Sequence, residues 1–134
     1  MSRVTVRRRS GLSHAVEIGD HQLVADEPLD AGGTDEGPAP TQLLAASLAS
    51  CTAITIALYA NRKEWDIEGL QVSVDFPGAP GRGEAAQFGV EVVLPDHLGE
   101  DERERIMVIA DKCPVHRILL GDIEIETRAA SSSG

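Results

Sequence analysis

Hydrophobic and polar residues alternate along the first 25 positions of the chain. Val4 and Val6 are separated by Thr5, so they point to one face of an extended strand while Arg3, Thr5 and Arg7 point to the other. The same alternation predicts three strands, at residues 3–9, 14–18 and 21–25. Turn-forming Ser10-Gly11 and Gly19-Asp20 separate these strands, which predicts an antiparallel meander.

A long loop at residues 26–40, rich in Pro and Gly, leads into the most apolar part of the chain. Loops of this length inside a compact domain are often functional, although a plain surface connection is the alternative. From Pro40 to Lys63 the sequence predicts a helix that is apolar on most faces, with alanines thinning one side. Such a helix is buried. Because one small domain cannot easily surround it, we expect a second copy of the chain to cover part of it.

The second half of the chain mixes strand and helix patterns. Alternation predicts strands at 66–75 and 88–94, and Ile123 and Ile125 predict a last short strand. Charged and apolar residues predict an amphipathic helix over 98–110 and a short helix over 115–120. This order predicts an α+β fold with one domain over residues 1–127 and a flexible polar tail over 128–134.

The composition limits the classes of partner. The chain has 134 residues, a formal charge of −10 and only four aromatic side chains. A chain this acidic repels phosphate backbones, so we expect no nucleic-acid partner. The basic run Arg7-Arg8-Arg9 is best explained as a solvated strand end. No secretory signal is visible, and residues 43–60 fall short of a membrane span. We therefore expect a cytoplasmic protein with no membrane partner, in which cysteines are free, catalytic or metal-bound.

Two cysteines carry the candidate chemistry. Cys113 directly precedes Pro114, so a helix that begins at Pro114 makes Cys113 its N-cap, where free amide groups favour a thiolate. Lys112, His116 and Arg117 add positive charge nearby. A buried structural cysteine is the alternative for Cys113, and a core cysteine is the more conventional interpretation of Cys51 in the middle of its helix.

Together the two cysteines suggest a redox pair. A thiolate that attacks a peroxide becomes a sulfenic acid, and a second thiol then condenses with it to a disulfide. This chemistry needs no metal and no organic cofactor. A metal site through Cys113-x-x-His116, with Cys51 as a third ligand, is a weaker alternative, since no fourth ligand has suitable spacing. The sequence offers no Gly-x-Ser-x-Gly motif, and carboxylates such as Asp26 are interpreted as solvated charges.

Three segments in combination resemble a known family. Residues 26–40 contain Gly37-Pro38-Ala39-Pro40 and run into the apolar stretch that ends at Cys51. Later comes Cys113-Pro114-Val115-His116. In combination these segments resemble the OsmC/Ohr family of osmotically induced and organic-hydroperoxide-resistance proteins, over roughly residues 3 to 127.

The resemblance implies an intertwined homodimer, in which antiparallel sheets wrap long central helices and the sites lie at the interface. It implies that Cys51 attacks the peroxide and that Cys113 resolves the intermediate, whereas the local sequence favours Cys113 as the activated thiol. Members of the family carry a Glu that orients an Arg, ten residues before the helix cysteine. Here that position is Thr41, followed by Gln42. The candidates for the activating arginine are Arg7, Arg8, Arg9 and Arg62.

Two functions are consistent with this sequence. The first is a thiol peroxidase, with catalytic Cys51 and Cys113, that reduces organic hydroperoxides, and also hydrogen peroxide, in defence against oxidative stress. A dithiol would supply the electrons, since no nicotinamide or flavin motif is present. The second is a non-enzymatic dimer that binds a small apolar ligand on the same fold, which Thr41 in place of the family's carboxylate favours.

Overall fold

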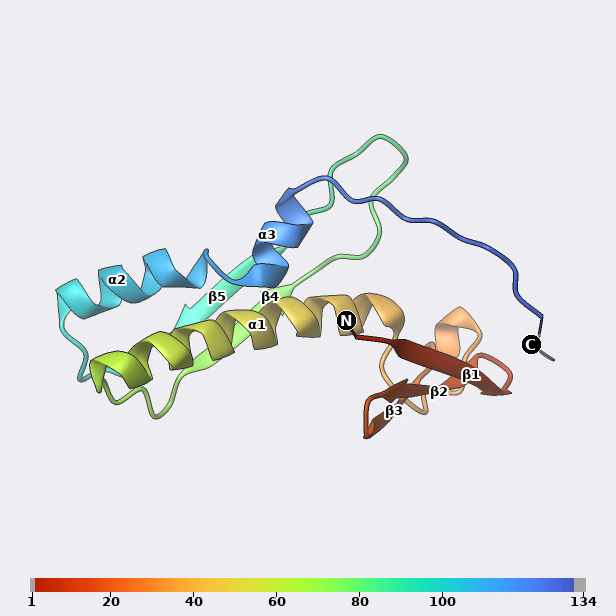
Figure 1. The fold of residues 1–134 in the computed structure, drawn as a ribbon, viewed down its shortest axis with the longest axis horizontal. Helices are drawn as coiled ribbons and strands as arrows, with labels where there is room; N and C mark the ends of the chain where they lie inside the picture. Colours follow the sequence, from red (N-terminus) through yellow and green to blue (C-terminus); the bar gives the residue numbers. More distant parts are fainter. Residues whose placement is uncertain (1, 132–134) are drawn as a thin grey trace. The chain divides into compact units, whose positions relative to one another are not determined.

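The computed structural model describes residues 2–131 and combines short strands with three α-helices over that range (Figure 1). The elements in chain order are β1 (Val4–Ser10), β2 (Ser13–Ile18), β3 (His21–Ala25), η1 (Leu29–Ala31), α1 (Pro40–Lys63), β4 (Gln71–Asp75), β5 (Gly89–Val93), α2 (Glu100–Ala110) and α3 (Pro114–Leu120). Because the strands and helices are segregated along the chain, the predicted α+β class is confirmed.

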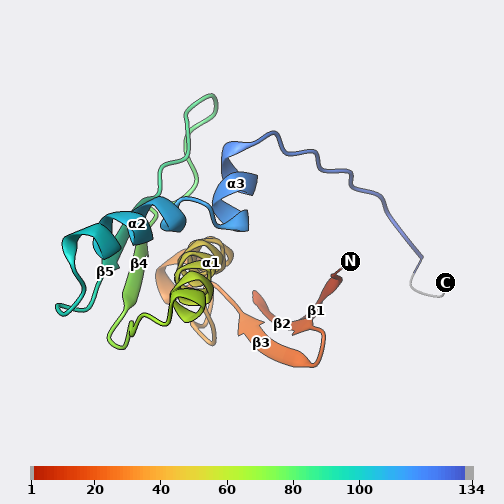
Figure 2. The same ribbon diagram turned by 60° about the vertical axis from the view of Figure 1, so that its left-hand side comes forward.

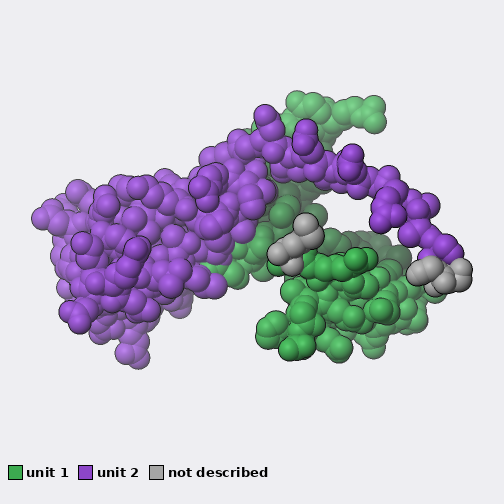
Figure 3. Space-filling view, viewed as in Figure 1, with its two compact units in different colours: residues 1–50, 72–92 green, residues 51–71, 93–134 purple. Residues whose placement is uncertain are grey.

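The chain forms two compact units, coloured separately in Figure 3. Unit 1 contains Met1–Ser50 and Val72–Val92, and unit 2 contains Cys51–Gln71 and Val93–Gly134. Helix α1 is continuous and contributes residues to both units. The single domain expected over residues 1–127 stays a prediction. Most of the polar tail expected at 128–134 lies outside the described residues.

Strands β1, β2 and β3 form the predicted antiparallel meander in unit 1. Val6 pairs with Val16, and Val16 pairs with Leu23, so apolar residues of the three strands line one face. Val16, on the central strand, is buried. Gly19 has a φ of 59°, the left-handed conformation that the tight turn between β2 and β3 requires.

The loop after β3 is folded around a buried carboxylate. Asp26 is 2% exposed and accepts hydrogen bonds from the amides of Glu27 (2.7 Å) and Glu36 (3.1 Å) and from the hydroxyl of Thr34 (2.8 Å). Burial alone raises the pKa of the Asp26 carboxyl, but these donors outweigh burial and lower that pKa below its usual value. The interpretation of Asp26 as a solvated charge was therefore wrong, since the carboxylate is buried and is held by the neighbouring Glu27 amide and by donors eight to ten residues away.

Helix α1 has the predicted bounds, Pro40 to Lys63. One stripe at four-residue spacing is buried, formed by Leu48, Thr52, Ile56 and Ala60. Ile54 and Leu58 on another face are 59% and 60% exposed. One chain therefore buries only part of this helix. By length and composition alone α1 does reach what a membrane span requires, with a mean hydropathy of 1.8, although the core helices of other proteins pass the same test.

Strands β4 and β5 pair in a two-stranded sheet, which belongs to unit 1 apart from the end residues Gln71 and Val93. Phe76 and Phe88 stack at the ends of the connection between these strands, with ring centroids 4.3 Å apart. The predicted strand over 66–75 is shorter than expected. Its first residues form a turn, in which the amide of Glu68 donates to the Asp66 carboxylate and Gly69 has a φ of 97°.

In unit 2, helix α2 lies beside the second half of α1 (Figures 1 and 2). Arg105 of α2 donates a hydrogen bond of 3.0 Å to the Tyr59 hydroxyl of α1, and Trp65 meets the Tyr59 ring edge-on. The buried side chains of this unit are Ile56, Ala60, Leu98, Ile106, Ala110 and Cys113, together with the polar Thr52. Helix α2 begins two residues later than predicted because Gly99 is its N-cap and the Glu102 carboxylate accepts from the Gly99 amide.

The last predicted strand is absent from the described residues. After α3 the chain continues to residue 131 as an extended segment without ladder pairing (Figure 1). Ile123 and Ile125 are 58% and 83% exposed. Alternation predicted an extended conformation correctly, but a strand also needs a neighbouring strand to bond with, and this segment has none among residues 2–131.

Candidate functional site

Cys113 is the N-cap of helix α3, as the position of Pro114 predicted. Pro114 lacks an amide proton and suits the first helical position. The Cys113 side chain therefore caps the first turn of the helix, and its sulfur accepts a hydrogen bond of 3.2 Å from the backbone N–H of His116, the third helical residue. Cys113 is 0% exposed, so this thiol is sealed from solvent.

Cys51 lies in the middle of α1 as a partly exposed, free thiol. It shares a helix face with Ile54 and Leu58, which follow at i+3 and i+7 and are both exposed. The two cysteines therefore differ in access. A small molecule in solution can reach the surroundings of Cys51, whereas Cys113 is enclosed.

The structure brings Cys113 beside the residue that follows Cys51. The hydroxyl oxygen of Thr52 lies 3.7 Å from the Cys113 sulfur, within hydrogen-bond range for sulfur. Thr52 is 1% exposed. Adjacent Cα atoms in a chain are about 3.8 Å apart, so the fold gathers Cys51, Thr52 and Cys113 into one small region of unit 2. Thr52 was missed by the sequence reasoning, and its only signal was a hydroxyl next to a cysteine in an apolar helix.

A cavity of about 570 Å³ lies over α3 and the turn before it. Lys112, His116 and Arg117 line this cavity together with Asp111, Leu120 and Gly121. The Nδ1 atom of His116 lies 4.0 Å from the Asp111 carboxylate. Of the three side chains expected to add positive charge near Cys113, Lys112 and Arg117 are exposed, and His116 is partly exposed and faces a carboxylate.

The candidate arginines all have other partners within this chain. Arg7 pairs with Glu17 at 2.7 Å, the Arg8 side chain donates to the Gly11 carbonyl, and Arg9 lies 3.9 Å from Glu36. Arg62 lies over the Tyr59 ring. It is eleven residues after Cys51 on the same helix, a separation of about 16 Å along the axis, so Arg62 does not activate Cys51 of its own chain.

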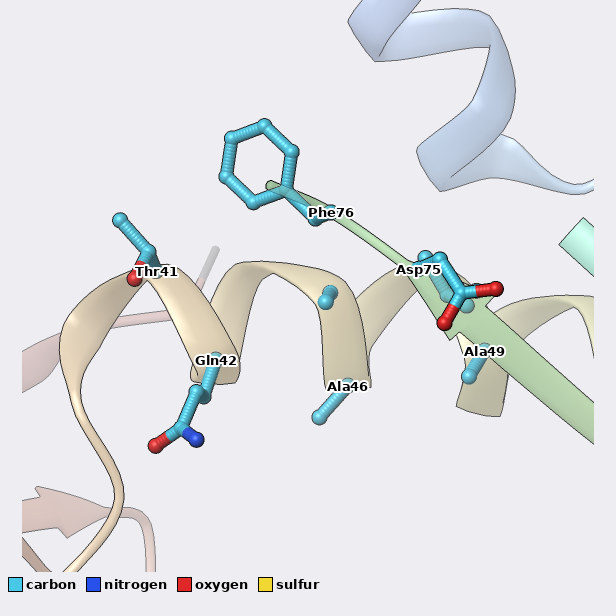
Figure 4. A pocket seen from close by; sticks show the side chains of 8 residues that line it. Thr41, Gln42, Ala46, Ala49, Asp75 and Phe76 are labelled. Atoms are coloured by element: carbon cyan, nitrogen blue, oxygen red, sulfur yellow. The ribbon is translucent and has the colours of Figure 1, made fainter. Parts of the chain in front are cut away.

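Thr41, at the position where the resemblance implies a Glu, lines a separate cavity in unit 1 (Figure 4). This cavity has a volume of about 410 Å³, with a floor of alanines on α1 and a wall formed by Val74, Asp75 and Phe76. Gln42 also lines it, and its side-chain oxygen accepts a hydrogen bond of 2.8 Å from the Ala39 amide. Gln42 therefore caps the start of α1.

Within residues 2–131, no three His, Cys, Asp or Glu side chains gather where a metal ion could bind. The metal site considered above would use the side chains of Cys113 and His116. In the fold the Cys113 sulfur contacts the His116 backbone amide, while the His116 ring faces Asp111. The donor set for a tetrahedral site is therefore not assembled among the described residues.

Comparison with known proteins agrees with this fold. The profile of the OsmC-like protein family matches residues 33–128. An OsmC-like protein from Mycoplasma pneumoniae has a similar structure, with a TM-score of 0.76 and 24% identity over 90% of this chain and 88% of the other. A candidate osmotic stress induced and detoxification response protein from Psychrobacter arcticus matches with a TM-score of 0.75 and 25% identity over 88% of each chain.

A third similar structure is that of an organic hydroperoxide resistance protein OsmC from Legionella pneumophila, with a TM-score of 0.62 and 24% identity over 90% of each chain. No protein of curated function matches the chain. The order of elements defines a small α+β protein that carries two free cysteines. The family profile covers most of that fold, and the chain belongs to the OsmC-like family.

Proposed function

We propose that this protein is a thiol peroxidase that reduces organic hydroperoxides. The observation that carries the proposal is the contrast between two free thiols in one region: Cys51 is partly exposed, while Cys113 is sealed beside Thr52. A peroxidase with two cysteines needs one thiol that the substrate can reach and a second one held in reserve.

The first step takes place at Cys51. Its thiolate attacks one oxygen of the hydroperoxide, the O–O bond breaks, and an alcohol leaves after taking up a proton. Sulfur is oxidised to a sulfenic acid and the peroxide is reduced. Exposure supports this assignment over the local preference for Cys113, because a thiol at 0% exposure does not meet a solute.

The second step uses Cys113. Its sulfur attacks the sulfenic sulfur of Cys51, an S–S bond replaces the S–O bond, and water leaves. The positioned N–H of His116 favours the negative charge that Cys113 carries as it attacks. An external dithiol then reduces the disulfide by thiol–disulfide exchange and returns both cysteines to their thiols.

The organic class of substrate is supported by the surroundings of Cys51. Ile54 and Leu58 add exposed apolar surface to its helix face, which favours a substrate with an apolar body over hydrogen peroxide, the secondary substrate. The similar protein from Legionella pneumophila is named for organic hydroperoxide resistance, as is one from Elizabethkingia anophelis. These names agree with the class inferred from the helix face.

The exposed face of α1 also supports a homodimer. Soluble monomers rarely expose large apolar patches, and a second copy that packs beside Ile54 and Leu58 would bury part of this patch while the remainder lines the substrate site next to Cys51. The partner chain is then also a source for the cation that Cys51 needs, because the candidate arginines Arg7, Arg9 and Arg62 have other partners within this chain. We propose a cytoplasmic location on the basis of the free thiols.

Peroxide consumption by the reduced protein tests this proposal. Wild type should consume one equivalent of an organic hydroperoxide and become about 2 Da lighter as the disulfide forms. Cys51→Ser should consume peroxide far more slowly than wild type. Cys113→Ser, the matched control, should consume its first equivalent normally but carry added oxygen instead of a disulfide. Consumption by Cys51→Ser at the wild-type rate would refute the assignment.

A second candidate function is that of a non-enzymatic binder of a small ligand. The cavity beside Thr41 favours it, since Thr41 and Gln42 cannot form the ion pair that the resemblance implies. Mass spectrometry after mild peroxide treatment separates the two functions. Unchanged mass in the wild type supports the binder, and a loss of two hydrogens that both cysteine variants lack supports the peroxidase.

A further inference from the structure

Thr52 is a polar side chain in the buried stripe of α1. It lies between Leu48 and Ile56 at four-residue spacing and is 1% exposed. A buried hydroxyl is costly unless it is hydrogen-bonded, so its place in this stripe calls for a partner of matching chemistry. The Cys113 sulfur, 3.7 Å from the Thr52 oxygen, is such a partner.

The Cys113 sulfur thus has two polar neighbours of different kinds. The amide of His116, at 3.2 Å, is a fixed donor held by the helix backbone. The Thr52 hydroxyl rotates, so it can accept a hydrogen bond from a neutral thiol and donate one to a thiolate. Only Thr52 can serve both charge states of the sulfur.

We propose that Thr52 is a positioning residue for the resolving step, an inference that rests on the proposed function. Its hydroxyl holds the Cys113 sulfur beside the residue that follows Cys51. The same hydroxyl stabilises the Cys113 sulfur as the thiol loses its proton. Cys113 then attacks the sulfenic sulfur of Cys51, the S–S bond forms, the S–O bond breaks, and the hydroxide departs as water with the proton from Cys113. Thr52 is unchanged at the end of the step.

Two substitutions separate the hydroxyl from the shape of the side chain. Thr52→Val keeps the shape and removes the hydroxyl, whereas Thr52→Ser keeps the hydroxyl and removes a methyl group. Reduced protein is given one equivalent of an organic hydroperoxide, samples are quenched with an alkylating agent, and intact mass follows disulfide and sulfinic acid. Loss of one hydrogen bond to sulfur predicts disulfide formation about five- to tenfold slower in Thr52→Val.

The effect should be confined to the second step. Peroxide loss in the first turnover should stay within about twofold of wild type in both variants, and Thr52→Ser should form the disulfide at nearly the wild-type rate. At excess peroxide, Thr52→Val should accumulate protein about 32 Da heavier, because slow resolution leaves Cys51 open to a sulfinic acid. A merely structural role would slow both steps together.

Two results would overturn the role of Thr52: disulfide formation at the wild-type rate in Thr52→Val, or equal slowing in Thr52→Val and Thr52→Ser. Failure of the proposed function is distinct, because wild type itself would then consume no peroxide. In that case diamide, which oxidises a dithiol to a disulfide without peroxide, measures the attack by Cys113 directly. Slower disulfide formation with diamide in Thr52→Val, but not in Thr52→Ser, supports the role of Thr52. Equal rates in wild type and Thr52→Val overturn the inference.

Discussion

The two isoleucines of α1 give a direct measure of what covers this helix. Ile54 is 59% exposed and Ile56 is 0% exposed, although only two positions separate them. Replacement of either residue by Ala removes the same three carbon atoms from the same helix. Each variant is therefore the matched control for the other, and helix propensity changes equally in both.

The expected cost of each substitution follows from its burial. Full burial of three carbons is worth about 2.4 kcal/mol, and Ile54 keeps about two fifths of that within one chain, which gives about 1 kcal/mol. Ile56→Ala also leaves a cavity, and its cost should be about 2–5 kcal/mol. If a second copy covers the helix, Ile54→Ala should cost about 2 kcal/mol or more, because the partner then buries the remainder.

Urea unfolding at two protein concentrations about a hundredfold apart measures both quantities, since the stability of a dimer depends on concentration. We expect the unfolding midpoint of wild type to rise with concentration and that of Ile54→Ala to rise less steeply. Midpoints independent of concentration in wild type, together with a cost for Ile54→Ala of about 1 kcal/mol or less, would refute the covered helix and the homodimer with it.

Other features of the fold lead to sharper single measurements. Because the pKa of Asp26 is lower in the folded state than in the unfolded state, the ionised carboxylate stabilises the fold above the unfolded pKa, and this stabilisation is lost as pH falls through the folded pKa. Asp26→Asn should therefore be less stable than wild type near neutral pH, and the difference should shrink in unfolding curves measured in acid. A difference that is the same at all pH values contradicts this. The hydrogen bond from Arg105 lowers the pKa of Tyr59, the only tyrosine of the chain, so Arg105→Gln should raise the phenol pKa in an ultraviolet titration, and an unmoved titration rejects the cause. A methyl group at Gly37 would overlap a backbone carbonyl of β3, so Gly37→Ala should cost about 1–3 kcal/mol in thermal unfolding, whereas Gly89→Ala, where the added carbon meets only ordinary contacts, is the comparison that should show a smaller loss.

Features set by nearby residues were predicted well from the sequence. The bounds of α1 follow from Pro40 at its first position and from the apolar run behind it. Cys113 as an N-cap follows from Pro114 alone. Both predictions depend on residues within a single helix or directly beside it, where local geometry decides the outcome.

Features set by distant residues were not predictable in the same way. The state of Asp26 depends on amides up to ten residues away, and the contact of Thr52 with Cys113 joins positions 61 apart. The strand expected at Ile123 and Ile125 has the right alternation but lacks a pairing partner among residues 2–131. Periodicity describes one segment at a time, whereas these features belong to pairs of segments.

The stacked rings of Phe76 and Phe88 have a consequence for the connection between them. The ring contact holds the two ends of residues 77–87 together. The pairing of β4 with β5 therefore does not depend on the conformation of the residues between the rings. Since the entropy of closing a loop grows only slowly with its length, residues here can be inserted or deleted at little cost. This connection is therefore a natural place to graft a tag or a fluorophore while the sheet stays intact.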